Sequence, residues 1–169
     1  MSDNFHSVLL SQAQGLDAKL CGEYFAKRLG YPDPNSEFAE HIGPAKYLFR
    51  VPFIRGPLFE QAKKRYFFPK GYDSVVLLNN QVLSSTTFQI KADKSLHIFS
   101  IHTPAALRGN GYTRRVQEDV IAVAREKGCS RVRLGAGGHP VLDKLLLFLE
   151  QKQKDLDIRV EDNYWITLM

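Results

Sequence analysis

A short glycine-containing segment is the part of the sequence best suited to bind an anion. Residues 108–113 read Arg-Gly-Asn-Gly-Tyr-Thr and lie where an apolar run, Leu96–Thr103, gives way to helical spacing over Tyr112–Glu126. The first turn of a helix has backbone N–H groups without intrahelical partners, and Gly109 and Gly111 would let the chain bring these donors close to a ligand. The junction therefore predicts a phosphate-binding loop.

A second glycine-rich segment, GAGGHP at residues 135–140, also follows an apparent strand and opens a helix. A dinucleotide-binding fingerprint needs a third glycine where Pro140 stands, and no acidic ribose partner follows in a suitable strand context. We interpret these glycines as room for a ligand or for the entry of the chain into the helix.

Other catalytic and metal-binding patterns are missing from the sequence. The five histidines have no paired metal-ligand spacing, and neither Gly-x-Ser-x-Gly nor a Walker sequence is present, so hydrolase and nucleoside triphosphatase functions are poorly supported. Cys21 and Cys129 are far apart and outside any Cys-x-x-Cys spacing. We expect two buried thiols, with no disulfide and no metal site.

Composition indicates a soluble protein that favours anionic ligands. The 169 residues predict one domain, 1–169, in which 1–70 is a variable part and 71–169 the core; the net charge is +5 and the pI about 9.2. No apolar run approaches membrane-spanning length, and the start MSDNFHSVLL does not resemble a targeting signal. The expected location is the cytoplasm.

The core reads as an α/β domain with a mixed sheet. Three antiparallel strands are predicted over Ser74–Leu78, Val82–Ile90 and Leu96–Thr103, followed by a helix that Gly128 ends. A strand over Arg131–Ala136 would run parallel to the third strand through a right-handed crossover.

Three further elements complete the prediction. The helix from Pro140 has apolar residues around most of its circumference and should be deeply packed, and Ile158–Leu168 should be one closing strand. Before the core, an amphipathic helix should end at Gly30 and a short one should span Leu58–Tyr66, whereas Tyr47–Ile54 is compatible with an edge strand or a loop.

The run IHTPAALRGNGYT, in its strand-to-helix context, resembles the acetyl-CoA signature of the GCN5-related N-acetyltransferases (GNAT). The resemblance is firm over Ser74–Ala136, and Thr113 replaces the usual final Ala or Gly. It implies a GNAT-like fold in which two central parallel strands splay into a V that holds acetyl-CoA or another acyl-CoA. The matching positions are Ile101, Thr103, Pro104, Arg108, Gly109, Gly111 and Tyr112.

The resemblance also assigns cofactor-binding roles. Backbone groups of Ile101 and Thr103 would pair with the pantetheine amides as an added strand would. The expected cofactor-binding residues are Ile101, His102, Thr103, Arg108, Gly109, Asn110, Gly111, Tyr112, Thr113, Arg114 and His139. No metal is implied.

Catalysis in such a fold needs a base for an acceptor ammonium and a hydrogen-bond donor for the thioester oxygen. Strand alternation predicts His97 on the same face as Ile101 and Thr103, with His102 on the other, and favours His97 as the base, although either histidine could be an ordinary sheet residue. Tyr164 as acid and Glu60 as base rest only on expected placement.

One departure from the family limits the prediction of activity. The family's usual Asn and general-acid Tyr are replaced by His139 and Leu146. The primary prediction is an N-acetyltransferase acting on a primary amine, and the alternative is a coenzyme A-binding regulatory or weakly active module.

A third hypothesis is a basic nucleic-acid-associated protein. It rests on the charge and on the basic and aromatic cluster Lys63–Phe68, which a solvated helix face would also explain. Small amines, peptide N-termini, lysine side chains and aminoacyl-RNA all remain open as acceptors, whereas a polycation is disfavoured by the positive charge.

Overall fold

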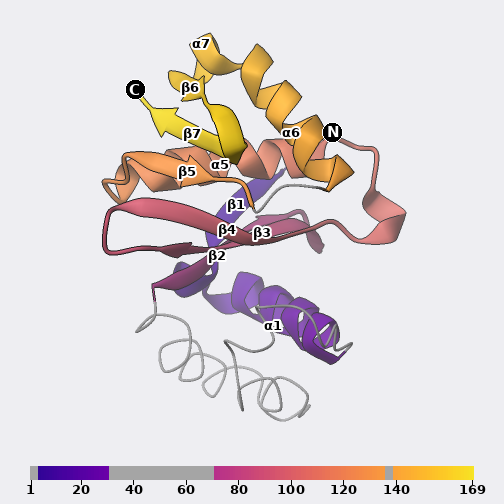
Figure 1. The fold of residues 1–169 in the computed structure, drawn as a ribbon. Helices are drawn as coiled ribbons and strands as arrows, with labels where there is room; N and C mark the ends of the chain where they lie inside the picture. Colours follow the sequence, from indigo (N-terminus) through magenta and orange to yellow (C-terminus); the bar gives the residue numbers. More distant parts are fainter. Residues whose placement is uncertain (1–3, 31–70, 136–138) are drawn as a thin grey trace.

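A mixed sheet with helices on both faces forms the centre of the molecule (Figure 1). The computed structural model describes residues 4–30, 71–135 and 139–169. The predicted helix over Leu58–Tyr66, the run Tyr47–Ile54, the candidate base Glu60 and the cluster Lys63–Phe68 lie outside the described residues.

The sheet has seven strands in the order β1-β2-β3-β4-β5-β7-β6. Parallel pairing occurs between β4 and β5, and the other neighbouring strands are antiparallel. This confirms the predicted antiparallel meander and the parallel crossover. The strands are β1 (His6–Leu9), β2 (Tyr72–Leu78), β3 (Val82–Ile90), β4 (Ser95–His102), β5 (Arg131–Arg133), β6 (Ile158–Val160) and β7 (Trp165–Leu168).

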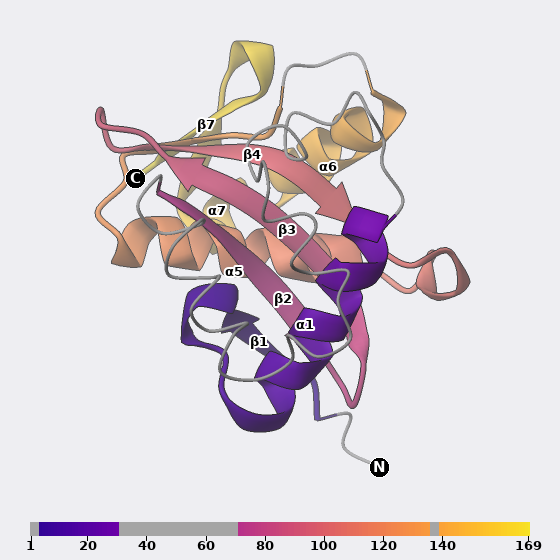
Figure 2. The same cartoon turned by 90° about the horizontal axis from the view of Figure 1, so that it is seen from below.

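Two helices cover opposite faces of the sheet. Figure 2 shows α1 (Gly15–Gly30) crossing in front of β2 and β3, with α5 (Tyr112–Glu126) behind the sheet. The α5 face holds the larger core, where Val116, Val120, Ile121 and Ala124 of the helix pack with residues such as Val75, Leu77, Phe88, Leu96 and Val132. On the other face, Cys21 and Phe25 of α1 pack with Val76 and Leu78. Burial of these side chains supplies the main stabilisation, about 1.5–3 kcal/mol for each large one.

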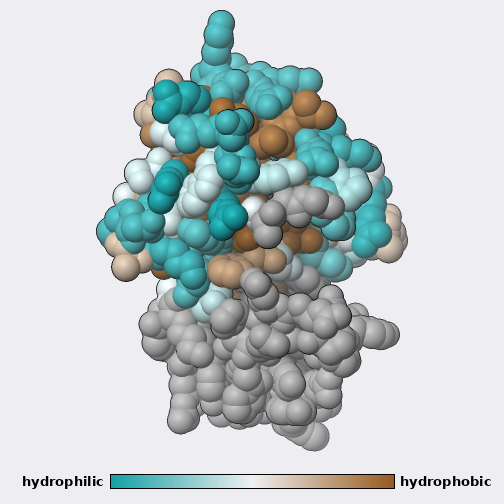
Figure 3. All heavy atoms as spheres, viewed as in Figure 1, coloured by the Kyte–Doolittle hydropathy of each residue, from teal (hydrophilic) through white to brown (hydrophobic). Residues whose placement is uncertain are grey.

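The prediction of a deeply packed helix from Pro140 was wrong. Helix α6 (Pro140–Gln151) buries Leu145 and Leu149 fully, but Val141 is 43% and Leu147 59% exposed. Figure 3 shows hydrophobic residues at the surface where α6 lies. The helix packs against the sheet through one stripe only, and its other apolar residues face solvent. A short helix, α7 (Gln153–Leu156), follows it.

The predicted closing strand Ile158–Leu168 is a hairpin of β6 and β7. A 3-10 turn, η4 (Asp162–Tyr164), separates the strands, and Asn163 and Tyr164 have φ angles of 58° and 64°. Left-handed backbone at two successive residues reverses the chain. The sequence also gave no warning of β1, a four-residue edge strand that pairs with the distant β2.

No helix among the described residues is both long and apolar enough to cross a membrane.

Candidate functional site

The loop before α5 has the backbone conformation that its glycines predict. Gly109 and Gly111 have φ angles of 86° and 79°, in the left-handed region that glycine adopts without strain. A Cβ added at either position would meet no heavy atom within 4 Å. The glycines are therefore required by backbone conformation, and the space beside them is open.

The N-terminus of α5 presents unsatisfied donors. The first helical hydrogen bond runs from the Arg115 N–H to the Gly111 carbonyl, 3.1 Å, and Gly111 is a cap residue without a capping side chain. Within the described part of the chain, the N–H groups of residues 109–114 have no hydrogen-bond acceptor. These donors point out of a helix end whose dipole favours an anion.

Charged side chains around this helix end are of the sign that an anion requires. The first turn of α5 has no acidic residue, although acidic residues there would stabilise the helix, and it carries Arg114 and Arg115 instead. The Arg108 Nε donates to the Thr103 carbonyl at 3.2 Å, which holds its guanidinium beside the loop. Arg114 lies over the Phe148 ring of α6, with its Cζ 5.4 Å from the ring centroid.

Buried hydroxyl groups fix the loop to the sheet. The Thr103 hydroxyl, at the end of β4, is 2.8 Å from that of Thr113 on α5 and 2.9 Å from that of Ser84 on β3. The Asn110 side chain donates to the Leu107 carbonyl at 2.9 Å and closes the loop that follows η3 (Ala105–Leu107). The Thr that replaces the family's usual Ala or Gly thus joins the helix to the strand.

Strands β4 and β5 separate where the predicted V should open. They pair from Ser95↔Arg131 to His97↔Arg133, and β4 then continues to His102 while β5 ends. The edge of β4 that faces β5 therefore loses its partner strand after His97. The predicted splay of the two strands is confirmed for the described residues.

The predicted face of His97 was wrong, because β4 contains a β-bulge. Thr87 of β3 pairs with Ser100 and Phe88 pairs with Ile98, so Phe99 is the extra residue on β4. A bulge shifts the alternation of side chains by one residue. Ile101 packs into the α5-side core, as Leu96 does, so His97 lies on the opposite face from Ile101.

The face that carries His97 is the accessible one. At this part of the sheet the α5 side is filled by buried side chains, including Leu96, Ile98 and Val132. On the other side, His97, Arg133 and Trp165 are only half-buried. A molecule that approaches the point where β4 and β5 separate must therefore come from the side of His97.

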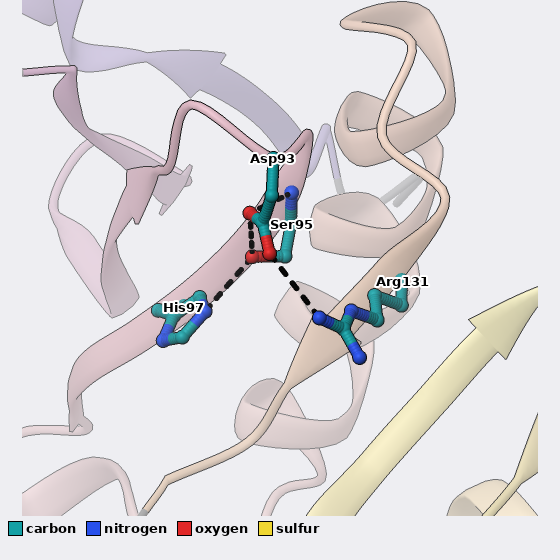
Figure 4. A network of polar contacts seen from close by, with 4 residues as sticks. All are labelled: Asp93, Ser95, His97 and Arg131. Atoms are coloured by element: carbon teal, nitrogen blue, oxygen red, sulfur yellow. Dashed lines mark hydrogen bonds and ion pairs between the residues drawn. The ribbon is translucent and has the colours of Figure 1, made fainter.

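A chain of hydrogen bonds orients His97 (Figure 4). The Ser95 hydroxyl donates to Asp93 Oδ1 at 2.5 Å, and the same oxygen is 2.9 Å from His97 Nε2. Because a carboxylate only accepts, the hydroxyl proton goes to Asp93, and Nε2–H of His97 must donate to the serine oxygen. The neutral imidazole then has its lone pair on Nδ1. Arg131 Nη2 donates to Asp93 Oδ2 at 3.2 Å and fixes the carboxylate.

The surroundings keep His97 neutral. Burial lowers its pKa below the usual 6.5, and the positive charges of Lys91 and Arg133 lower it further, against a smaller opposite effect of Asp93. The ring also packs edge-on against Trp165, with centroids 5.3 Å apart. A neutral, oriented imidazole with its lone pair on Nδ1 can accept a proton.

Three other predicted site residues have local partners. His102 Nδ1 is 2.5 Å from the Tyr24 hydroxyl on the α1 side, and that hydroxyl is 2.8 Å from Ser85 Oγ. The Tyr164 hydroxyl donates to Asp143 on α6 at 2.6 Å. His139 caps α6 by accepting from the Val141 N–H at 3.2 Å.

Sequence reasoning missed the Asp93, Ser95 and Arg131 that surround His97. The available signal was the spacing of Asp93, Ser95 and His97, two residues apart along an extended segment, which places all three on one face. It also missed Trp165 and Arg133, because β5 and β7 become neighbours only through the sheet topology. Among the described residues, no group of three His, Cys, Asp or Glu side chains gathers as a metal site.

The Asp93 network makes a testable contribution to stability. Hydrogen bonds from Ser95 and then Arg131 lower the pKa of Asp93 from 3.8 to about 2. The unfolded chain therefore takes up this proton first, so the contribution is full above pH 3.8 and is lost as the pH falls toward about 2. We expect Asp93→Asn to lower the urea midpoint at pH 6 and to converge with the wild type near pH 2. Asp162→Asn, outside the network, is the control, and an Asp93→Asn deficit that does not shrink with pH would contradict the assignment.

Comparison with solved structures relates this geometry to known proteins. The chain resembles a protein from Desulfovibrio desulfuricans assigned to the GNAT family of acetyltransferases, with 11% identity over 93% of this chain and 86% of that one, at a TM-score of 0.57. A GNAT-family acetyltransferase from Elizabethkingia anophelis, solved with acetyl-CoA bound, is 15% identical over 95% of this chain and 80% of that one, at a TM-score of 0.52.

Other comparisons are partial or negative. The match to nourseothricin acetyltransferase spans 38% of this chain and 39% of that one, with 16% identity and a TM-score of 0.35. No family model matches the sequence, and no curated protein sequence matches it significantly. The mixed sheet, the separation of β4 from β5 and the full-length structural matches together establish that the chain has the fold of the GNAT acetyltransferases.

Proposed function

We propose that this protein transfers an acetyl group from acetyl-CoA to a primary amine by direct attack of the amine. The observation that carries the proposal is the loop at residues 108–114, whose unpartnered N–H groups lie at the end of β4, where that strand has separated from β5. The Elizabethkingia protein of the same fold was solved with acetyl-CoA bound, which supports the choice of cofactor.

The residues present fit this cofactor. The N–H groups of residues 109–114, with Arg108 and Arg114, are suited to a pyrophosphate, and the β4 edge at Ile101 and Thr103 is suited to the pantetheine amides. From Thr103 back to the bulge at Phe99 is about 13 Å of extended strand, the length that an extended pantetheine arm needs. When bound, the cofactor supplies an acetyl thioester.

His97 is the base in this proposal. Its Nδ1 removes a proton from the acceptor ammonium, which frees the nitrogen lone pair to attack the thioester carbonyl carbon. The new C–N bond forms as the C–S bond breaks, and the electron pair of that bond leaves with sulfur. The neutral state of His97 at pH 7 and its position on the accessible face support this role.

The departing thiolate takes its proton from water in this proposal. Leu146 is partly buried against the core and has no proton to give. The Tyr164 hydroxyl donates to Asp143 and would have to leave that carboxylate to act as an acid. A thiol such as that of cysteine has a pKa of about 8.5, so a thiolate is a stable enough leaving group near neutral pH.

Leu146 also favours a second candidate function, a coenzyme A-binding module with little catalytic activity. One experiment separates the two. Calorimetric titration with acetyl-CoA would be followed by incubation with a panel of primary amines while a chromogenic reagent records free thiol. Saturable binding with amine-dependent thiol release supports acetyl transfer, and binding without release supports the module. Absence of binding would overturn both.

A further inference from the structure

One arginine beside His97 has no partner within the described chain. Arg133, on β5, is half-buried, and its Nε is buried without a hydrogen bond. Among the described residues its guanidinium forms no ion pair, and its one recorded contact is with the Trp165 ring, 5.6 Å from Cζ to the centroid. A buried charged donor without a partner is costly, so a partner from outside the chain is expected.

Acidic residues on the same face are already engaged. Asp93 pairs with Arg131 at 3.2 Å, and Glu161 pairs with Arg159 at 3.0 Å and accepts from Thr167 at 2.8 Å. Lys91, the other cation near His97, donates to Gln89 at 2.5 Å. Arg133 thus leaves about one positive charge uncompensated on this face, which matches a monoanion better than a phosphate group of charge near −2.

Position links this charge to the proposed reaction. Arg133 and His97 are register partners on the last rung that joins β4 and β5, so their Cα atoms are about 5 Å apart and both side chains rise from the accessible face. Trp165 lies against both side chains. A guanidinium held beside an aromatic ring keeps its N–H fork available for a carboxylate.

We infer that Arg133 binds a carboxylate of the acceptor, so that the acceptors are small amines with a carboxylate close to the amine, the chemistry of a free amino acid. This inference rests on the proposed acetyl transfer. Binding of the carboxylate at Arg133 places the neighbouring amine at His97 Nδ1. The same charge repels polyamines, whose second ammonium would meet Arg133.

The test compares amino acids with the corresponding amino acid amides as acceptors. We expect the wild type to prefer the acids by about 100-fold in kcat/KM, and Arg133→Gln to lose about that factor for acids, mostly through KM, while its activity with amides is unchanged. Arg133→Lys should recover only part of the loss because its ammonium lacks the planar fork. Arg159→Gln, on the same face but paired with Glu161, is the matched control and should change either activity less than about twofold.

Two results would overturn the inference. Equal wild-type activity with acids and amides would do so, and so would an Arg133→Gln variant that lowers both by the same factor while its acetyl-CoA affinity and urea midpoint stay normal. Failure of acetyl transfer itself is recognised separately, because neither series would then release thiol.

Discussion

Gly111→Glu is expected to abolish acetyl-CoA binding, with affinity weakened more than about 100-fold, while the protein stays folded. Gly111 has a φ of 79°, and a Cβ in left-handed backbone costs about 1–2 kcal/mol. That cost is partly offset because a carboxylate at a helix N-terminus is stabilising by about 0.3–1 kcal/mol. The same carboxylate would occupy the N–H groups that should bind the pyrophosphate and would repel it. Calorimetric titration with acetyl-CoA measures the loss.

The same helix provides a matched control. Gly128, just after the other end of α5, has a φ of 72° and equally open surroundings, so Gly128→Glu introduces the same strain without touching the donors. We expect Gly128→Glu to keep its acetyl-CoA affinity but to lose more stability than Gly111→Glu, because a carboxylate is unfavourable at a helix C-terminus. Normal affinity in Gly111→Glu would show that this loop is not the cofactor site.

Local patterns predicted the cofactor loop well. The alternation in Val82–Ile90, the helical spacing after Tyr112 and the glycines between strand and helix each depend on residues close in sequence. The structure confirms these elements, and it adds contacts from Ser84 and Thr113 to the end of β4.

Features that depend on distant pairing or on single backbone conformations were not predictable. The Phe99 bulge arises where β4 pairs with β3, and nothing in the types of the neighbouring residues marks it. Left-handed Asn163 and Tyr164 divide the predicted closing strand, although tyrosine seldom adopts that conformation. Strand β1 is too short to signal itself and pairs with a strand more than sixty residues away.

The misplaced face of His97 has a chemical consequence. With simple alternation, His97 would have pointed into the core beside α5, where an acceptor has no access. The bulge lets one strand serve both faces: Ile101 and Thr103 belong to the side of α5 and the loop, whereas His97 meets Arg133 and Trp165 on the accessible side. The cofactor loop and the proposed base are thus separated by a break in the strand's regularity.

His97→Ala is expected to lower kcat/KM by about 100- to 10,000-fold and to leave acetyl-CoA affinity unchanged, because a general base contributes to the chemical step and not to cofactor binding. Thiol release at saturating acetyl-CoA measures the first, and calorimetry the second. His102→Ala is the matched control on the same strand, where the imidazole contacts Tyr24. Full activity in His97→Ala together with loss in His102→Ala would assign the base to His102.

The pH profile gives His97 an independent signature. The base must be neutral, so activity falls as the pH drops through its pKa, and burial together with Lys91 and Arg133 places that pKa below 6.5. The acidic limb of kcat/KM should therefore lie below pH 6.5 in the wild type. In Lys91→Gln one of the charges that lower the pKa is gone, whereas Asp93, Arg131 and Arg133 remain, and the limb should move to higher pH. A limb that stays in place in this variant would show that the titrating group is not His97.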